Sequence, residues 1–304
     1  MSLPPLPMTV IAGYLGAGKT TLINRLLDED HGLRLLVMVN DFGAINIDRK
    51  LLASEDADTL TLTNGCVCCT MGADLFLAIG DALDRRPRPD HLVIEASGIA
   101  DPARIANAAR AEPDLTYGGI VTVVDGTSFA DLSADPMIGA QIRGQVACAD
   151  LLAVSKCPEV PAELALRCAT LTPAPAVAVN GLGGLADLLL GPRSTRSEAR
   201  PIDHPAYTAW SWTGDVSLTR EALSEHLAQR PEGVFRLKGW VRAPQGGSWT
   251  VQVVGRSVEI TPAPETPETA LVAIGLRQNT TPNDIAAWWE RVVQTGRLSQ
   301  SSTS

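Results

Sequence analysis

The chain has 304 residues, of which 45% are hydrophobic and 19% are charged, so it can build one large domain or two ordinary ones. Its formal net charge of −9 argues against a nucleic-acid partner, because no surplus of cations exists to neutralise phosphates. No apolar run is long enough to span a bilayer, and Pro4, Pro5 and Pro7 interrupt the stretch where a signal peptide would begin. We therefore expect a cytoplasmic protein without a membrane or nucleic-acid partner.

Short apolar runs separated by helical stretches fill residues 1–190. Such runs are typical of a mostly parallel sheet covered by helices on both faces, in which the chemistry lies at the carboxyl ends of the strands. The polar residues expected at that rim are Asp41, Glu95, Asp125 and Lys156. The predicted strands are 8–12, 35–40, 59–62, 91–94, 119–124, 151–154 and 176–179, and the predicted helices are 21–27, 73–83, 102–111 and 138–149.

The pattern changes after a polar, proline-flanked stretch at 191–205, which we interpret as a linker. Residues 206–298 are predicted to form a smaller α+β domain, an antiparallel sheet plus helices, and residues 299–304 to form a disordered tail. The predicted strands are 207–212, 233–241, 249–254, 258–260 and 270–276, and the predicted helices are 217–229 and 281–293.

Both helices of this second domain carry a predicted N-terminal cap. Ser217 with Glu221 completes a capping pattern for the first helix. Thr281 stands directly before Pro282, which favours a cap followed by proline at the first helical position.

Residues 13–21 (GYLGAGKTT) fit the phosphate-binding pattern G-x-x-x-x-G-K-[ST]. They lie between a predicted strand and a predicted helix, so backbone N–H groups and the helix dipole converge on a bound anion. Lys19 is expected to reach the β- and γ-phosphates, and the Thr20 hydroxyl to bind Mg²⁺. The first domain is thus predicted to be a P-loop NTPase of the α/β class, with nucleotide contacts from Gly13, Gly16, Ala17, Gly18, Lys19, Thr20 and Thr21.

Two carboxylates are expected to serve this loop. Glu95 ends a predicted strand, where a carboxylate contacts Mg²⁺ through water or positions the attacking water. Asp41 follows the second strand, where a switch loop would meet Mg²⁺ and the γ-phosphate. The alternatives are a solvated charge at a strand end and an ordinary Asp at the start of a loop. The predicted catalytic residues are Lys19, Glu95 and Asp41, and Gly98 is a further expected nucleotide contact.

Cys66, Cys68 and Cys69 place three thiols within four residues on a turn that a glycine begins. A thiolate-rich site favours Zn²⁺ or Cu⁺, and tetrahedral Zn²⁺ needs one further ligand, which Asp41 or water could supply. The alternatives are a redox pair and buried cysteines that act as small apolar residues. In a cytoplasmic chain, metal ligands or reactive thiols take precedence over disulfides.

Taken together, these motifs resemble those of the CobW family of P-loop GTPases, which are related to the nickel chaperones for urease and hydrogenase. The resemblance covers most of the chain. The matching segments are GYLGAGKTTL (13–22), NDFGAINID (40–48), NGCVCC (64–69), EASGIADP (95–102), VTVVD (121–125), ADLLAVSK (149–156), RLKGW (236–240) and VAIGL (272–276).

The resemblance implies a GTPase that binds GTP or GDP with Mg²⁺ and couples hydrolysis to metal transfer. Its metal-binding switch would deliver Zn²⁺ or Co²⁺ from the cysteine cluster to a client metalloprotein. It leaves open which protein is the client and whether the chain forms a homo-oligomer.

The chain departs from the family pattern at two places. The guanine-reading N-K-x-D appears as Ser155-Lys156-Cys157-Pro158, so proline replaces the carboxylate while Ser155 and Lys156 stay as expected nucleotide contacts. Glu159 stands one residue late and is the alternative reader of the base. Ala44 also occupies a position where many members carry Glu. The preference for GTP over ATP is therefore left open.

The same motifs are also compatible with a second function. The chain could be a P-loop kinase or an ATP-driven regulator in which the cysteines hold a structural zinc. A kinase should have an acceptor pocket and an arginine-rich lid, and the sequence identifies neither. A non-catalytic binding module is disfavoured by the complete set of Lys19, Thr20 and Glu95.

Overall fold

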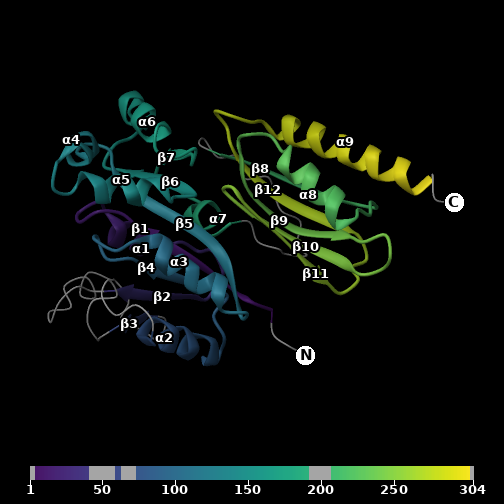
Figure 1. The fold of residues 1–304 in the computed structure, drawn as a ribbon, viewed down its shortest axis with the longest axis horizontal. Helices are drawn as coiled ribbons and strands as arrows, with labels where there is room; N and C mark the ends of the chain where they lie inside the picture. Colours follow the sequence, from purple (N-terminus) through teal and green to yellow (C-terminus); the bar gives the residue numbers. More distant parts are fainter. Residues whose placement is uncertain (1–3, 41–58, 63–72, 192–206, 302–304) are drawn as a thin grey trace. The chain divides into compact units, whose positions relative to one another are not determined.

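The computed structural model describes residues 4–40, 59–62, 73–191 and 207–301 (Figure 1). The chain divides into two compact units, Met1–Leu190 and Gly191–Ser304. Within the described ranges, no helix combines the length and the apolar character needed to cross a membrane.

The first unit is built on a parallel sheet of seven strands in the order β3-β2-β4-β1-β5-β6-β7. β1 lies at its centre, and Val10 pairs with Ile94 on one side and Ile120 on the other. The predicted α/β fold class is confirmed. The strands are β1 (Leu6–Ala12), β2 (Leu35–Asn40), β3 (Thr59–Leu62), β4 (His91–Glu95), β5 (Leu115–Asp125), β6 (Leu151–Ser155) and β7 (Ala176–Ala178).

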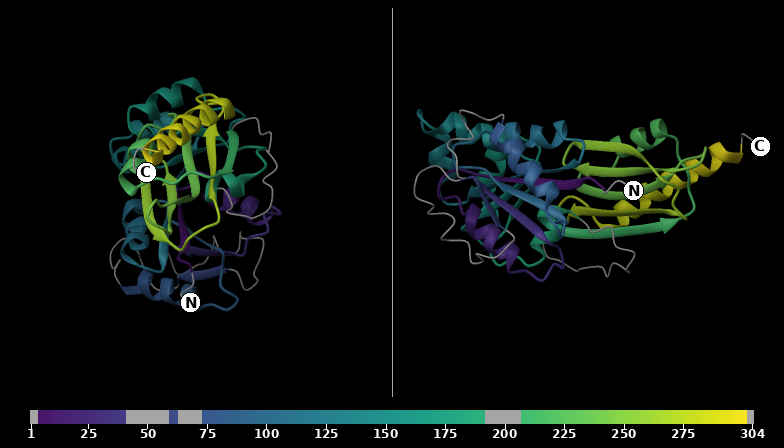
Figure 2. Two further views of the ribbon diagram at one scale, coloured as in Figure 1. Left: turned by 90° about the vertical axis from the view of Figure 1, so that its right-hand side faces the viewer. Right: turned by 90° about the horizontal axis from the view of Figure 1, so that it is seen from below.

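Helices flank this sheet on both sides, as Figure 2 shows. The order of the strands explains why: the connection from β1 to β2 moves toward the β3 edge of the sheet, whereas the connections from β3 onward move toward the β7 edge. Right-handed crossovers then place the helix between β1 and β2 on the face opposite to the helices of those later connections. The helices are α1 (Lys19–Leu27), α2 (Ala73–Asp84), α3 (Pro102–Ala111), α4 (Phe129–Ala134), α5 (Gly139–Ala147), α6 (Ala162–Ala169) and α7 (Leu185–Leu190).

The sequence missed α4, α6 and α7 because these helices have only 6, 8 and 6 residues, too few for a clear periodic pattern. It also began β5 too late, at 119. The strand continues through two glycines at a register shift opposite Met8 and Thr9. A Cβ on Gly118 would lie 2.6 Å from Thr9 Oγ1, so only glycine allows β1 to approach this closely.

The second unit is a sheet of five antiparallel strands in the order β11-β10-β9-β12-β8, with α8 (Arg220–Ala228) and α9 (Pro282–Ser301) on one face (Figure 1). This confirms the predicted α+β class. The buried face of α9 contributes Ile285, Trp288 and Trp289 to a core shared with α8 and the sheet. The strands are β8 (Tyr207–Gly214), β9 (Val234–Arg242), β10 (Ser248–Val254), β11 (Ser257–Ala263) and β12 (Thr269–Leu276).

The caps of these two helices differ from the prediction in one case. Thr219, not Ser217, caps α8: its Oγ1 accepts a hydrogen bond from Ala222 N at 3.2 Å. Ser217 instead forms a parallel bridge with Arg242, which holds it in extended backbone. Thr281 caps α9 as predicted, with Oγ1 accepting from Asp284 N at 3.2 Å.

The end of the chain also differs from the prediction. Residues 299–301, expected in a disordered tail, continue α9 to Ser301, because no proline follows Pro282 to interrupt the helix. The predicted linker at 191–205 lies outside the described residues except for Gly191.

Replacement of Trp289 by alanine tests the core of the second unit. The side chain is fully buried, and its ring centroid lies 5.6 Å from that of Trp212 and 5.5 Å from that of Trp288. The cavity left behind should lower the free energy of unfolding by about 3–5 kcal/mol, measured by chemical denaturation. Trp289→Phe, which keeps a ring in the cavity, should cost less, and a loss below about 1 kcal/mol for Trp289→Ala would contradict this packing.

Candidate nucleotide-binding site

The loop between β1 and α1 takes a conformation that only its glycines allow. Gly13, Gly16 and Gly18 have φ angles of 140°, 74° and 98°. A Cβ on Gly13 would lie 2.4 Å from the carbonyl oxygen of Val123 on β5. Gly18 is the N-cap of α1, and among the described residues no side chain caps this helix. Its first backbone N–H groups therefore remain as an anion-binding site.

Lys19 folds back across this loop. Its side chain is buried, with 8% of its surface exposed. Its Nζ donates to the carbonyl oxygens of Gly13 at 2.9 Å and Tyr14 at 3.4 Å. The ammonium thus lies against the loop between β1 and α1, where it would neutralise phosphate charge.

Thr20 and Glu95 meet next to the loop. Glu95 is the last residue of β4, is 3% exposed, and accepts a hydrogen bond from Thr20 Oγ1 at 3.1 Å through its Oε1. A hydrogen bond of 2.8 Å from Ala96 N to Ile11 O continues the pairing of β4 with β1. This bond fixes the position of Glu95 relative to the end of β1. A hydroxyl and a carboxylate oxygen side by side are ligands that Mg²⁺ accepts, so these residues fit that ion.

The turn after Glu95 presses against the loop. Ala100 N donates to Ser97 O at 3.0 Å and closes the turn, which we call the 97–100 turn. A Cβ on Gly98 would lie 2.6 Å from Leu15 Cδ2 and 2.8 Å from Leu15 N. Gly98 is therefore in direct contact with the phosphate loop, and a larger residue would displace it.

Ser155 and Lys156 lie at the end of β6. Ser155 Oγ donates to Ala17 O at 2.6 Å and ties β6 to the phosphate loop. Lys156 has a φ of 61°, and its Nζ donates to Asp125 Oδ2 at 2.7 Å. Burial would raise the pKa of Asp125, but hydrogen bonds from Lys156 and Thr127 outweigh it and hold that pKa well below its usual range. The carboxylate therefore stays ionised at neutral pH.

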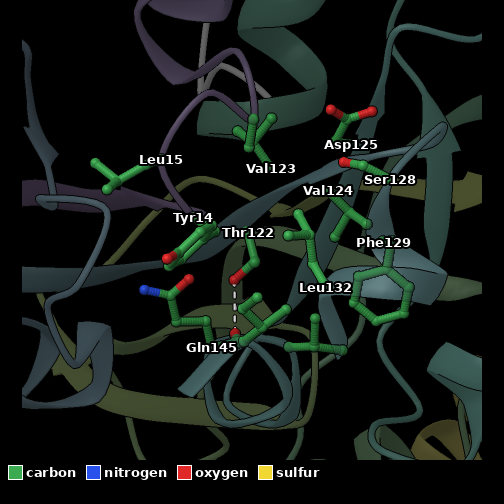
Figure 3. A pocket seen from close by; sticks show the side chains of 13 residues that line it. Tyr14, Leu15, Thr122, Val123, Val124, Asp125, Ser128, Phe129, Leu132 and Gln145 are labelled. Carbon is green, nitrogen blue, oxygen red and sulfur yellow. Dashed lines mark hydrogen bonds between the residues drawn. The ribbon is translucent and has the colours of Figure 1, made fainter. Parts of the chain in front are cut away.

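A small apolar cavity lies behind the loop, between it and α5 (Figure 3). Its volume of about 30 Å³ admits water but no nucleotide base. Thr122 Oγ1 on β5 donates to Gln145 O on α5 at 2.8 Å across this space. The residues around it are Tyr14, Leu15, Ala17, Thr122, Val123, Val124, Asp125, Ser128, Phe129, Leu132, Ile142, Gln145 and Val146.

The structure thus brings together Lys19, Thr20 and Glu95, and links Gly98 and Ser155 to the phosphate loop through Leu15 and Ala17. Thr21 lies on α1 with its side chain exposed. The predicted ligands Asp41, Cys66, Cys68 and Cys69, and also Ala44, lie outside the described residues.

Sequence reasoning missed Gln145, a buried polar residue that bonds to the 97–100 turn. The signal was present as a glutamine on the apolar side of a helix, between Ile142 and Val146. Unpaired amides are costly to bury, so a glutamine at such a position indicates a specific hydrogen-bond partner.

Three cysteines lie among the described residues. Cys148, Cys157 and Cys168 are free thiols. Within the described ranges, no three His, Cys, Asp or Glu side chains gather closely enough to hold a metal ion.

Comparison with known proteins identifies both units. Residues 7–173 match the family model "CobW/HypB/UreG, nucleotide-binding domain", and residues 207–292 match "Cobalamin synthesis protein cobW C-terminal domain". The first match alone covers more than half of the 304 residues.

Three curated relatives align with part of the chain. Zinc chaperone CobW of Sinorhizobium sp is 42% identical over 41% of this chain and 38% of its own length. Zinc chaperone YjiA of Escherichia coli is 36% identical over 50% and 49%. Zinc-regulated GTPase metalloprotein activator 1 of Dictyostelium discoideum is 38% identical over 41% and 31%. Each alignment therefore spans about half or less of the relative's length.

The reactivity of Cys148 and Cys168 tests their burial. Burial raises the pKa of each thiol to about 11, and the charge of Asp101 adds to the effect at Cys148. Only the thiolate is alkylated, so at pH 8 about one thiol in a thousand is reactive. Alkylation by iodoacetamide, followed by mass spectrometry, should be slow and should accelerate about tenfold per pH unit from pH 7 to pH 10. The denatured protein is the control, and equal rates in both states at pH 8 would contradict the raised pKa values.

Proposed function

The chain belongs to the CobW family, and from that premise we propose that it is a GTPase metallochaperone, which hydrolyses GTP and passes Zn²⁺ to a client metalloprotein. Relatives that carry the names zinc chaperone and zinc-regulated GTPase metalloprotein activator support this role. The family models on both units support it further. Co²⁺ is the other cargo that the family resemblance admits.

One observation carries the proposal: the half-buried hydrogen bond between Thr20 and Glu95 beside the folded-back Lys19. A phosphate loop that only binds anions does not need a carboxylate at 3.1 Å from its threonine. A protein that binds a triphosphate with Mg²⁺ does, because the ion needs oxygen ligands next to the phosphates.

Each residue has a role in this proposal. Lys19 compensates the charge of the β- and γ-phosphates, and the backbone N–H groups at the start of α1 bind the phosphate oxygens. Thr20 and Glu95 would hold Mg²⁺, which neutralises charge that develops between the β- and γ-phosphates. Glu95 would also position the attacking water, and Asp41 would meet Mg²⁺ and the γ-phosphate.

The cargo site is proposed at Cys66, Cys68 and Cys69, whose thiolates suit Zn²⁺. In the sequence the three cysteines come after β3, which pairs with β2, and Asp41 directly follows β2. β2 and β3 both end at the carboxyl edge of the sheet, the edge that carries Glu95. Loss of the γ-phosphate would change the Asp41 segment and, through it, the affinity for the metal.

The test is an equilibrium competition for Zn²⁺ against a chromophoric chelator, with a non-hydrolysable GTP analogue, with GDP and without nucleotide. Coupling between nucleotide and metal must be reciprocal. We expect Zn²⁺ affinity to differ about fivefold or more between the triphosphate and diphosphate states. Equal affinity in all three states would refute the coupling.

Two variants separate the nucleotide side from the metal side. Lys19→Ala should abolish GTP hydrolysis and the nucleotide dependence while Zn²⁺ binding persists. Replacement of Cys66, Cys68 and Cys69 by serine should remove tight Zn²⁺ binding and leave GDP binding unchanged, because serine hydroxyls are weak neutral ligands. Stoichiometric tight Zn²⁺ in the triple variant would place the cargo site elsewhere.

A further prediction concerns the base. Ser155 Oγ is bonded to Ala17 O, and Pro158 has neither a carboxylate nor a backbone N–H. Within 155–158 no side chain thus offers the paired acceptor that distinguishes guanine from adenine. Loss of such a charge-assisted pair costs about two to three kcal/mol. We therefore expect a GTP preference over ATP of about tenfold or less in competition binding.

Pro158→Asp is the matched variant, and it should raise the preference for GTP, since it restores the carboxylate at the usual position. Glu159→Gln tests the alternative reader. A parental preference above about a hundredfold that Glu159→Gln removes would show that the base is read by Glu159.

A further inference from the structure

We propose that Gln145 of α5 is a positioning residue for triphosphate hydrolysis: it holds the 97–100 turn against the phosphate loop. The inference rests on the proposed nucleotide-hydrolysing function. It assigns a role to a residue that touches neither the loop glycines nor Lys19, Thr20 or Glu95 in the described contacts.

Both N–H groups of the Gln145 amide bond to the turn. The residue is 3% exposed, and its Nε2 donates to Gly98 O and to Ala100 O, each at 3.1 Å. An amide nitrogen carries two hydrogens, so both donors are satisfied by this one segment. Because both donors of this buried amide bond to one turn, the amide fixes where that turn lies relative to α5.

Gln141, one helical turn earlier, completes the contact. Its Nε2 donates to Ile99 O at 2.5 Å. The two glutamines stand four residues apart, which places them on the same face of α5. Together they bind the carbonyl oxygens of Gly98, Ile99 and Ala100, three consecutive residues.

The helix that presents these amides is itself anchored to the sheet. Thr122 Oγ1, in the interior of β5, donates to Gln145 O at 2.8 Å in a fully buried hydrogen bond, drawn in Figure 3. Ile142 and Val146 are buried on either side of Gln145. The position of the turn is thus set relative to β5 rather than by its own short connection to β4.

On its other side the turn has no free space. Gly98 is so close to Leu15 that a Cβ would fall 2.6 Å from its side chain. The turn therefore lies between Gln145 and the phosphate loop, and it begins two residues after Glu95. A change in its position would act first on the segment that carries Glu95, whereas the backbone N–H groups at the start of α1 lie on another element.

The proposal is tested with Gln145→Met and Gln145→Glu in the full chain. Methionine has a similar volume and no donor, so the turn loses both bonds. The loss of two neutral hydrogen bonds corresponds to about a tenfold change in an equilibrium or rate constant. The kcat for GTP hydrolysis should therefore fall about tenfold. The dissociation constant of GDP should stay within about twofold, since GDP has no γ-phosphate. Gln141→Met, at a less buried position with one bond, is the matched control and should lower kcat less.

Gln145→Glu supplies a readout that a purely structural role would not give. An ionised carboxylate would face two carbonyl oxygens and repel them, whereas the protonated acid can donate to one. Burial favours the neutral form, so protonation should occur within an accessible pH range. The kcat of this variant relative to the parent should therefore rise as pH falls from 8.5 to 6, while that of Gln145→Met stays constant.

The outcomes are distinguishable. Parental kcat in Gln145→Met, or a pH-independent ratio in a folded Gln145→Glu, would overturn the positioning role and leave the proposed function intact. A parent that neither binds nor hydrolyses GTP would overturn both. Circular dichroism verifies folding, and the pH comparison within Gln145→Glu still decides the matter if Gln145→Met does not fold.

Discussion

The pairing of β1 with β4 on one side and β5 on the other is the constraint on which the site depends. The register sets Ile11 opposite Glu95 and opposite Val121, so the carboxyl ends of the three strands reach one edge together. Lys19 and Thr20 follow β1, Glu95 ends β4, and Asp125 and Ser155 end β5 and β6. The strands are held by burial on both faces: Met8, Val10 and Ile11 are wholly inaccessible to solvent.

The phosphate loop is held in shape by the protein's own donors and acceptors. Lys19 bonds to Gly13 O, and Ser155 bonds to Ala17 O from a strand 138 residues away in the chain. The glycines remove the side chains that would prevent this curvature, and Gly13 lies against β5 itself. These contacts are internal to the protein, so they lower the reorganisation needed when the loop binds an anion.

The rim of the sheet thus has two parts that differ in how they are held. One part, at the end of β6, is held by the hydrogen bond of Ser155 and by the ion pair of Lys156 with Asp125. Lys156 itself has left-handed backbone. The opposite side consists of the 97–100 turn, whose carbonyl oxygens are bound by the amides of α5. The first part contacts the phosphate loop at Ala17, and the second contacts it at Leu15.

The sequence by itself determined the phosphate loop, the parallel apolar strands and the antiparallel second domain, because each depends on local spacing and composition. It also named Asp41 and the cysteine cluster, which remain predictions. Only the tertiary structure decided that Thr20 lies 3.1 Å from Glu95 across 75 residues, that Ser155 supports Ala17, and that Gln145 binds the turn at Gly98. These contacts follow from strand order and register, which bring distant segments to one edge and leave no periodic signal in the chain.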